Sequence, residues 1–261
     1  NHNIYYNYSR DGGMNWQSDD ILLDDDEEGR SMSLGPQIAL WNSRVYVAWF
    51  DSINGAYDIY LAASSDDGET FKDPIRVDSG KAGDAYSAYP QLLVSDGGVV
   101  YVAWEDSRDE LSDIYFSYSQ DYGGSFSNDI RLDGGDAAGA NDSFSPQLAA
   151  YGEQVYAVWH DDRNGANRDI FFNWSENSGG TWLGSAVRVE TDGEGFADSI
   201  YPKIVGFDGR AHIAWQDART NAGYDVHYRT FEGGAFVGEA DVRLDVSDGQ
   251  GYSNSLKPQI A

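Results

Sequence analysis

The chain repeats itself every 54 to 56 residues, and this period constrains its fold more than any other feature of the sequence. The segment ValTyrValAlaTrp at 45–49 returns at 100–104, as ValTyrAlaValTrp at 155–159 and as AlaHisIleAlaTrp at 211–215. A second series consists of prolines, each followed by Gln or Lys and two mostly apolar residues: Pro36, Pro90, Pro146, Pro202 and Pro258. Two independent patterns that keep one period over four or more copies indicate a single structural unit, repeated with hardly any insertion.

Each repeat contains four strand-like runs in a fixed order. In the second complete copy they are the run after Pro90, residues 99–104, residues 113–119 and residues 129–132. The AspGlyGly turn at 96–98 joins the first two runs as a hairpin. No long run has the period of 3.6 residues that a helical repeat requires. Four short strands in a unit of this length are typical of a β-propeller blade, so we predict an all-β fold of four-stranded antiparallel blades.

The two ends of the chain supply complementary parts of one blade, and we predict that strands from both termini close the propeller. Residues 1–35 read as the C-terminal half of the closing blade, and residues 258–261 read as its first strand. The single propeller domain 1–261 would then hold four full blades: 36–89, 90–145, 146–201 and 202–257. About 20 further residues would complete five periods, so we expect five blades, or six if the chain is a piece of a longer protein.

A turn of the form Ser-x-Asp-x-Gly-x-x-Trp or Phe lies between the third and fourth strands. The fourth copy has Asn in place of Asp, and a fifth copy at 230–236 is one residue short. Asp or Asn would accept hydrogen bonds from backbone amides, Gly would adopt the positive φ of the turn, and the aromatic residue would pack between sheets. The residues predicted to form these hairpins are Ser9, Asp11, Gly13, Trp16, Ser64, Asp66, Gly68, Phe71, Ser119, Asp121, Gly123, Phe126, Ser175, Asn177, Gly179 and Trp182.

With these hairpins the chain resembles, over essentially its whole length, the Asp-box or bacterial neuraminidase repeat propellers that sialidases typify. The resemblance implies that the hairpins are structural and lie on the face opposite an active site. The same hairpins occur in sialidases, other glycoside hydrolases, sorting receptors and assembly factors. The resemblance therefore predicts the fold and leaves the function open.

The loop between the second and third strands is expected on the face where a ligand would bind. In three copies this loop has an arginine two residues after an aspartate, and the ligand-binding candidates are Asp106, Arg108, Asp161, Arg163, Asp217 and Arg219. One interpretation is an ion pair that holds the loop within its own blade. The other is that the guanidinium groups bind a carboxylated sugar, or that the aspartates collect Ca²⁺. Repetition favours the ion pair, because catalysis needs its site in one place only.

A sialidase requires more than a propeller. Family enzymes bind the substrate carboxylate with three arginines and use a tyrosine nucleophile, a glutamate that activates it and an aspartate acid/base, with an ArgIlePro-type motif on an early strand. No ArgIlePro occurs in this chain, and most arginines stand at equivalent repeat positions, such as Arg76, Arg131, Arg188 and Arg243. We therefore assign no catalytic residue from the sequence and lean toward a protein that is not an enzyme.

The composition limits the partners. The formal charge is −27, from 44 acidic and 17 basic residues, so the phosphates of nucleic acid or of an anionic membrane would be repelled. The carboxylates could hold Ca²⁺ or simply form a well-solvated surface, and no cofactor is expected to be required. The chain has no Cys and no apolar run that could span a bilayer. Absence of disulfides is compatible with secretion.

We predict a secreted or cell-surface binding propeller that recognises a glycan or a protein. Aromatic residues of the inter-blade loops would stack on sugar rings or pack between blades: Tyr86, Phe144, Phe196 and Tyr252. Two alternatives stay open. One is a sialidase-like exo-glycosidase whose missing parts lie outside this piece, and the other is a structural spacer of a large surface protein.

Overall fold

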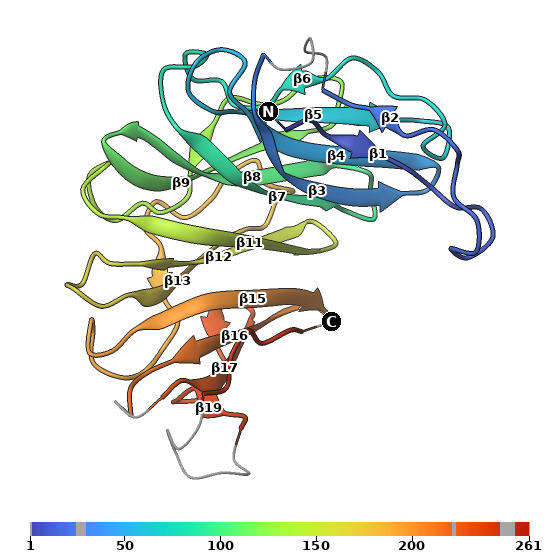
Figure 1. The fold of residues 1–261 in the computed structure, drawn as a ribbon. Coiled ribbons are helices and arrows are strands. Elements are labelled where there is room, and N and C mark those ends of the chain that lie inside the picture. The colour runs from blue at the N-terminus through green and yellow to red at the C-terminus, as the bar shows by residue number, and fades with distance from the viewer. Residues whose placement is uncertain (1, 25–29, 221–222, 246–253, 261) are drawn as a thin grey trace. The chain divides into compact units, whose positions relative to one another are not determined.

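The computed structural model describes residues 2–24, 30–220, 223–245 and 254–260, and every regular element in this part of the chain is a β-strand (Figure 1). The chain divides into two compact units. Unit 1 comprises residues 1–104 and 117–129, and unit 2 comprises residues 105–116 and 130–261. One sheet, β7–β10, has residues in both units, whereas each of the other sheets lies within one unit.

Four sheets follow the predicted order of strands within a repeat. Their strands are β3 (Ser33–Trp41), β4 (Arg44–Asp51), β5 (Asp58–Ser64) and β6 (Ile75–Arg76); β7 (Ser87–Val94), β8 (Val100–Asp109), β9 (Leu111–Ser119) and β10 (Ile130–Arg131); β11 (Ser143–Tyr151), β12 (Gln154–Asp161), β13 (Asp169–Ser175) and β14 (Val187–Arg188); β15 (Ser199–Phe207), β16 (Arg210–Asp217), β17 (Asp225–Glu232), β18 (Ala235–Phe236) and β19 (Val242–Arg243). Neighbouring strands in β3–β6, β11–β14 and β15–β19 run antiparallel. A fifth sheet pairs β1 (Tyr5–Tyr6) with β2 (Ile21–Leu22). The predicted all-β fold with several four-stranded antiparallel sheets is confirmed, whereas the sheet β15–β19 has five strands.

The second strand of each sheet forms the core. The four tryptophans of the repeat, Trp49, Trp104, Trp159 and Trp215, are at most 1% exposed. In three sheets the indole N–H donates to the aspartate two residues later, as in Trp215 to Asp217 at 3.1 Å. The same aspartate accepts the hydroxyl of a serine on the first strand. The tryptophan series therefore marks a buried unit of Trp, Asp and Ser whose polar atoms are paired with one another.

The proline series marks a bulge inside the first strand. In β3, β11 and β15 the register shifts at the proline. The residue before each proline has a positive φ of 52° to 62°, although only the first is glycine: Gly35, Tyr89, Ser145, Tyr201 and Lys257. Because proline has no N–H to donate to the ladder, a bulge is where a strand can contain it. The first strands consequently begin three residues before the predicted starts at Pro36 and Pro90, at Ser33 and Ser87.

Residues 254–260 form no strand. Lys257 nevertheless has the φ of 55° that precedes the other prolines, so this segment begins in the same way as the first strand of a repeat. The number of blades and the closure of the propeller by strands from both termini stay predictions.

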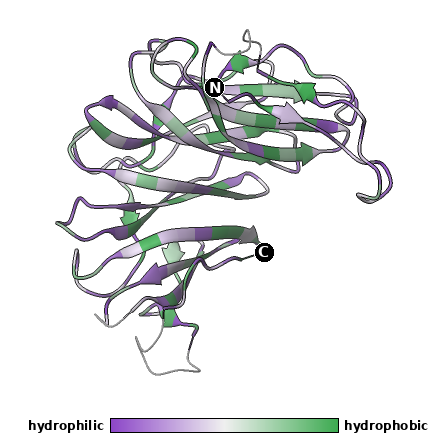
Figure 2. Ribbon diagram, viewed as in Figure 1, coloured by the Kyte–Doolittle hydropathy of each residue, from purple (hydrophilic) through white to green (hydrophobic). Residues whose placement is uncertain are grey.

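Apolar side chains between neighbouring sheets hold each unit together, and Figure 2 shows apolar residues along the strands. In unit 2, residues of β12, β13 and β16 share one buried cluster, among them Val158, Phe172 and Trp215. In unit 1 a second cluster joins Ile4 and Leu23 to β4. Among the described residues no helix is long and apolar enough to cross a membrane.

Candidate functional site

The four predicted hairpins share one hydrogen-bond pattern. The serine hydroxyl donates to the side-chain oxygen of the Asp or Asn two residues later, at 2.7 to 2.9 Å. The same hydroxyl accepts a hydrogen bond from the backbone amide of the glycine four residues after the serine. The same Asp or Asn accepts the amide of the residue four positions after it. These glycines have φ values of 79° to 88°, which a side chain would strain. The pattern explains why Ser, Asp or Asn, and Gly keep their spacing.

Hydrogen bonds from the turn lower the pKa of three hairpin carboxyls to about 2: Asp11, Asp66 and Asp121. The bond from the side chain of Asn15 contributes most for Asp11, that of Thr70 for Asp66, and that of Ser119 for Asp121. Two hairpin aromatics pack against a strand of the preceding sheet: Phe71 against Tyr6 of β1 and Trp182 against Phe116 of β9, each at 4.9 Å between ring centroids.

Trp16 differs from these two aromatics. It is 62% exposed and lines a pocket in unit 1 with Ile38 and Leu40.

The six candidate residues of the loop after the second strand form three separate ion pairs in unit 2. In each pair the Arg Nε and Nη2 donate to both oxygens of the Asp two residues earlier, as in Arg108 to Asp106 at 2.8 and 2.6 Å. The side chains of Asp106, Asp161 and Asp217 are at most 1% exposed. Arg108 also lies over the ring of Tyr115, and Arg163 over the ring of Phe171, at 4.1 and 4.2 Å. Each arginine thus pairs with its own aspartate, and ligand binding by these residues stays a prediction.

A second repeated ion pair joins the fourth strand to the start of the third. Arg131 lies 3.1 Å from Asp113, and Arg76, Arg188 and Arg243 make the same contact with Asp58, Asp169 and Asp225. Three of these aspartates also accept the amide of a glycine in the loop that leads to the next sheet. Two aspartates therefore hold the loops at this end of the sheet. The aspartate at the end of the second strand holds the loop to the third strand, and the aspartate that begins the third strand holds the loop that leads to the next sheet.

Metal binding has no preformed site in the part of the chain that the structure describes: no group of three or more His, Cys, Asp or Glu side chains there could hold an ion. Binding of Ca²⁺ stays a proposal.

One position at this end of the sheets differs from repeat to repeat. The residue between the tryptophan and its aspartate is Phe50, Glu105, His160 or Gln216, and each is buried. Three of them contact the residue before the proline in the first strand of the next sheet: Phe50 contacts Tyr89, Glu105 contacts Ser145, and His160 contacts Tyr201. We call these residues and their contacts the variable end.

In unit 1 the variable end is wholly aromatic. Phe50 packs against Tyr57 at 5.0 Å and Tyr89 at 5.4 Å between ring centroids, and Tyr57 packs against Tyr86 at 5.1 Å. Tyr86 and Tyr89 are 40% and 52% exposed. A Cβ on Gly35 would lie 2.5 Å from the Phe50 ring, so only glycine fits beside this cluster.

In unit 2 the variable end combines aromatic and ionisable groups. The His160 ring lies 6.0 Å from Phe144 and 5.8 Å from Tyr201, measured between ring centroids. The Arg168 guanidinium lies over the Phe144 ring at 5.6 Å. Tyr201 is half exposed, whereas His160 is 4% exposed. The exposed Tyr201 ring therefore contacts a buried imidazole, and Phe144 on the same imidazole lies beneath a guanidinium.

Burial shifts the pKa values of Glu105 and His160 away from their ordinary values, in opposite directions. Glu105 is 8% exposed and accepts the Ser145 amide at 2.8 Å, and burial raises its pKa to about 7, to which the charge of Asp142 adds. Burial, reinforced by the charge of Arg168, lowers the pKa of His160 to about 3. At neutral pH His160 is uncharged and Glu105 is partly protonated, the state in which a carboxyl can donate a proton or a hydrogen bond.

The predicted stacking residues have different surroundings. Phe144 belongs to the variable end of unit 2 and Tyr86 to that of unit 1, while Phe196 is 58% exposed in the loop before β15. Tyr252 lies outside the described residues. The sequence interpretation did not single out Glu105, His160 or Tyr201. The signal that could have found them is variation at a fixed position of an otherwise constant repeat.

No protein family model and no curated protein matches the chain. An α-L-arabinanase of Penicillium chrysogenum, solved with arabinobiose, is 19% identical with a TM-score of 0.60, covering 87% of this chain and 70% of that one. A GH93 α-L-arabinofuranosidase of Fusarium graminearum, also with arabinobiose, is 17% identical with a TM-score of 0.59, covering 84% and 68%. The NanB sialidase of Streptococcus pneumoniae is 11% identical with a TM-score of 0.53, covering 85% and 53%. Together with the repeated sheets, this likeness supports a β-propeller fold shared with carbohydrate-active proteins.

Proposed function

We propose that the chain is a carbohydrate-binding β-propeller of the Asp-box type, and that the variable end of unit 2 is its glycan site. The observation that carries the proposal is the exposed Tyr201 ring on His160, whose ring also contacts Phe144 beneath the Arg168 guanidinium. Aromatic faces stack on the apolar faces of sugar rings, and a few polar groups around them fix the orientation of the sugar. The arginine–aspartate pairs serve as the scaffold that fixes these loops.

The exposed ring of Tyr201 is not a requirement of its backbone conformation. A φ of 52° is strained for a bulky residue, and this conformation is set by the bulge at Pro202. Tyr89 has the same conformation and is equally exposed. Since Gly35 occupies this position without a side chain, the fold does not require the ring.

A neutral glycan fits the charge of the protein best. The formal charge of −27 repels uronic and sialic acids unless a cation intervenes. Arabinobiose, the ligand named for two of the similar structures, is a neutral sugar and is the first probe we would use.

The test is calorimetric titration of arabino-oligosaccharides and, for comparison, of a sialyl-oligosaccharide. We expect the neutral sugar to bind and Tyr201→Gly to weaken its binding at least about tenfold, the loss of one stacked ring. Phe207→Ala, which removes a 68% exposed ring from the other end of β15, should leave binding unchanged. Equal binding by the two variants would refute the site.

A second candidate, glycoside hydrolysis, is favoured by Glu105. A carboxyl with a pKa near 7 is suited to protonate a leaving group, although a glycosidase also needs a second carboxylate across the sugar. Release of nitrophenol from aryl arabinofuranosides and sialosides would decide. If the protein is an enzyme, Glu105→Gln should lose activity, and the unaltered protein should lose activity as the pH rises through about 7. If glycans bind without turnover, the protein is a binding protein.

The remaining parts of the proposal concern the setting of the protein. We place it outside the cell or on its surface, as a binding module for glycans. A protein ligand, or a spacer role without a ligand, would be favoured if no sugar binds.

A further inference from the structure

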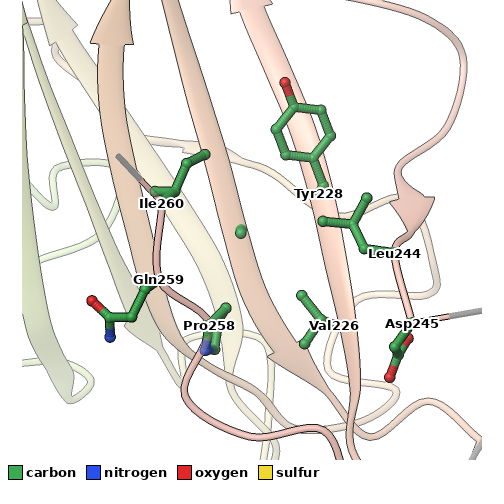
Figure 3. A pocket seen from close by; sticks show the side chains of 8 residues that line it. Val226, Tyr228, Leu244, Asp245, Pro258, Gln259 and Ile260 are labelled. Carbon is green, nitrogen blue, oxygen red and sulfur yellow. The ribbon is translucent and has the colours of Figure 1, made fainter.

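Unit 2 has an apolar pocket of about 430 Å³ beside sheet β15–β19 (Figure 3). Figure 3 shows Val226 and Tyr228 of β17 and Leu244 beyond β19 on one side, and residues 258–260 on the other. Leu244 is 51% exposed. None of the residues proposed above to bind a glycan, His160, Phe144, Arg168 and Tyr201, lines this pocket.

The preceding repeat shows what covers this face. Its equivalent residues are completely buried: Val158, Ile170, Phe172 and Val189. They pack in one cluster with alternate residues of β16, the second strand of the following sheet: Ala211, Ile213 and Trp215. The face of one repeat is therefore covered by the second strand of the next.

Unit 1 has the same packing. Ile4 and Leu23, which flank the two-stranded sheet β1–β2, are 5% and 4% exposed. They pack against alternate residues of β4, again a second strand: Val45, Val47 and Trp49. Two independent interfaces thus have the same geometry, with a tryptophan at the third alternate position.

The segment 258–260 has the conformation that begins a further sheet. Pro258 follows a residue with a φ of 55°, as Pro202 follows Tyr201 with a φ of 52°. Ile204, the equivalent of Ile260, packs on the cluster of the preceding repeat. Residues 258–260 therefore line the pocket directly after the backbone conformation that precedes the proline of each first strand, although they form no strand themselves. No described strand covers this face as β16 covers the preceding repeat.

We propose that this pocket binds a β-strand of the repeat's second-strand type. The partner is an extended segment with three apolar side chains at alternate positions, small or β-branched at the first two and Trp at the third. It adds beside residues 258–260 by backbone hydrogen bonds, while its apolar side chains fill the pocket. Alternation gives the specificity, because shifting the segment by one residue turns these side chains away.

The chain supplies its own probe. A labelled peptide with the sequence of Arg210–Asp217, ArgAlaHisIleAlaTrpGlnAsp, places Ala, Ile and Trp on one face. A control peptide of the same composition, ArgHisAlaIleTrpAlaGlnAsp, places the apolar residues consecutively, so that Ile and Trp point to opposite faces of the strand. Fluorescence anisotropy with the intact chain should show binding of the first peptide at least about tenfold tighter than of the second. Equal affinities would overturn the proposal.

Two variants locate the binding. Leu244→Asp places a charge in the pocket and should weaken peptide binding at least about tenfold. Val237→Asp is the control, because Val237 is 49% exposed and does not line the pocket. This variant should bind the peptide as tightly as the unaltered chain does. If Leu244→Asp binds the peptide as tightly as the unaltered chain does, the proposal is overturned. It is also overturned if sedimentation shows that the chain is a dimer, that Leu244→Asp dissociates this dimer, and that the peptide does not dissociate it. Circular dichroism checks that both variants are folded.

Discussion

Replacement of Glu105 by Gln should make the protein more stable at neutral and alkaline pH. Glu105 is 8% exposed and accepts one hydrogen bond, from the amide of Ser145. The amide oxygen of Gln can accept the same bond, and the charge is removed. The fourth repeat has Gln216 at this position, 2% exposed, so the fold accommodates a buried glutamine there.

The size of the effect follows from the pKa. Burial raises the pKa of Glu105 from 4.5 to about 7, and each unit corresponds to about 1.4 kcal/mol. Between these values the folded state binds more protons than the unfolded state, so this carboxyl lowers the stability of the unaltered protein as pH rises. The difference in unfolding free energy between Glu105→Gln and the unaltered chain should therefore grow by about 3 kcal/mol between pH 4.5 and pH 8.

The assay is urea unfolding of both proteins across this pH range. Other buried carboxyls with raised pKa values, such as Asp78 and Asp113, are present in both proteins and cancel in the difference. The reciprocal change Gln216→Glu should introduce a loss of stability with rising pH. A difference between Glu105→Gln and the unaltered chain that stays constant with pH would refute the reasoning.

Three further predictions concern the scaffold. Arg163→Ala leaves the Asp161 carboxylate, 1% exposed, without its ion partner and should cost about 3–5 kcal/mol in urea unfolding, whereas Arg10→Ala, at a half-exposed pair, should leave the stability nearly unchanged; equal losses would contradict this. Asp121→Ala removes the acceptor of the third hairpin and should cost about 1–2 kcal/mol by the same assay, whereas Asp121→Asn should cost less, because Asn177 accepts the same bonds in the fourth hairpin. Excess EDTA should leave the melting temperature unchanged, and a lowered value would show a structural cation.

The strands and the hairpins could be predicted from the sequence because each depends on local chemistry. The tryptophan series lies on buried strands, and the Ser-x-Asp-x-Gly turns form hydrogen bonds within eight residues. The bulge that the proline series marks could not be predicted from the sequence in the same way. The positive φ before each proline is adopted by residues as different as Gly35, Tyr201 and Lys257, so no residue type signals the bulge.

The candidate site depends on contacts between neighbouring sheets, which no local pattern reports. Glu105 belongs to β8 and its hydrogen-bond donor Ser145 to β11, 40 residues later. The raised pKa of Glu105 comes from burial between these elements. In the sequence, only its variable position within the repeat distinguishes Glu105 among the 44 acidic residues, and that position does not reveal its burial.

The sequence interpretation took the near-identity of the repeats as evidence against catalysis. That evidence is weaker when the constant positions of the repeat are considered apart from the variable end, because the two kinds of position make different contacts. The Trp, Asp and Ser unit and the arginine–aspartate pairs place buried polar atoms against one another, and a change at any of them leaves an unpaired partner. The variable end has no such requirement, because it accepts Phe50, Glu105, His160 or Gln216 with the fold unaltered. Constant positions therefore reflect the stability of each repeat, and a function confined to one or two repeats can develop at the variable end without cost to the rest.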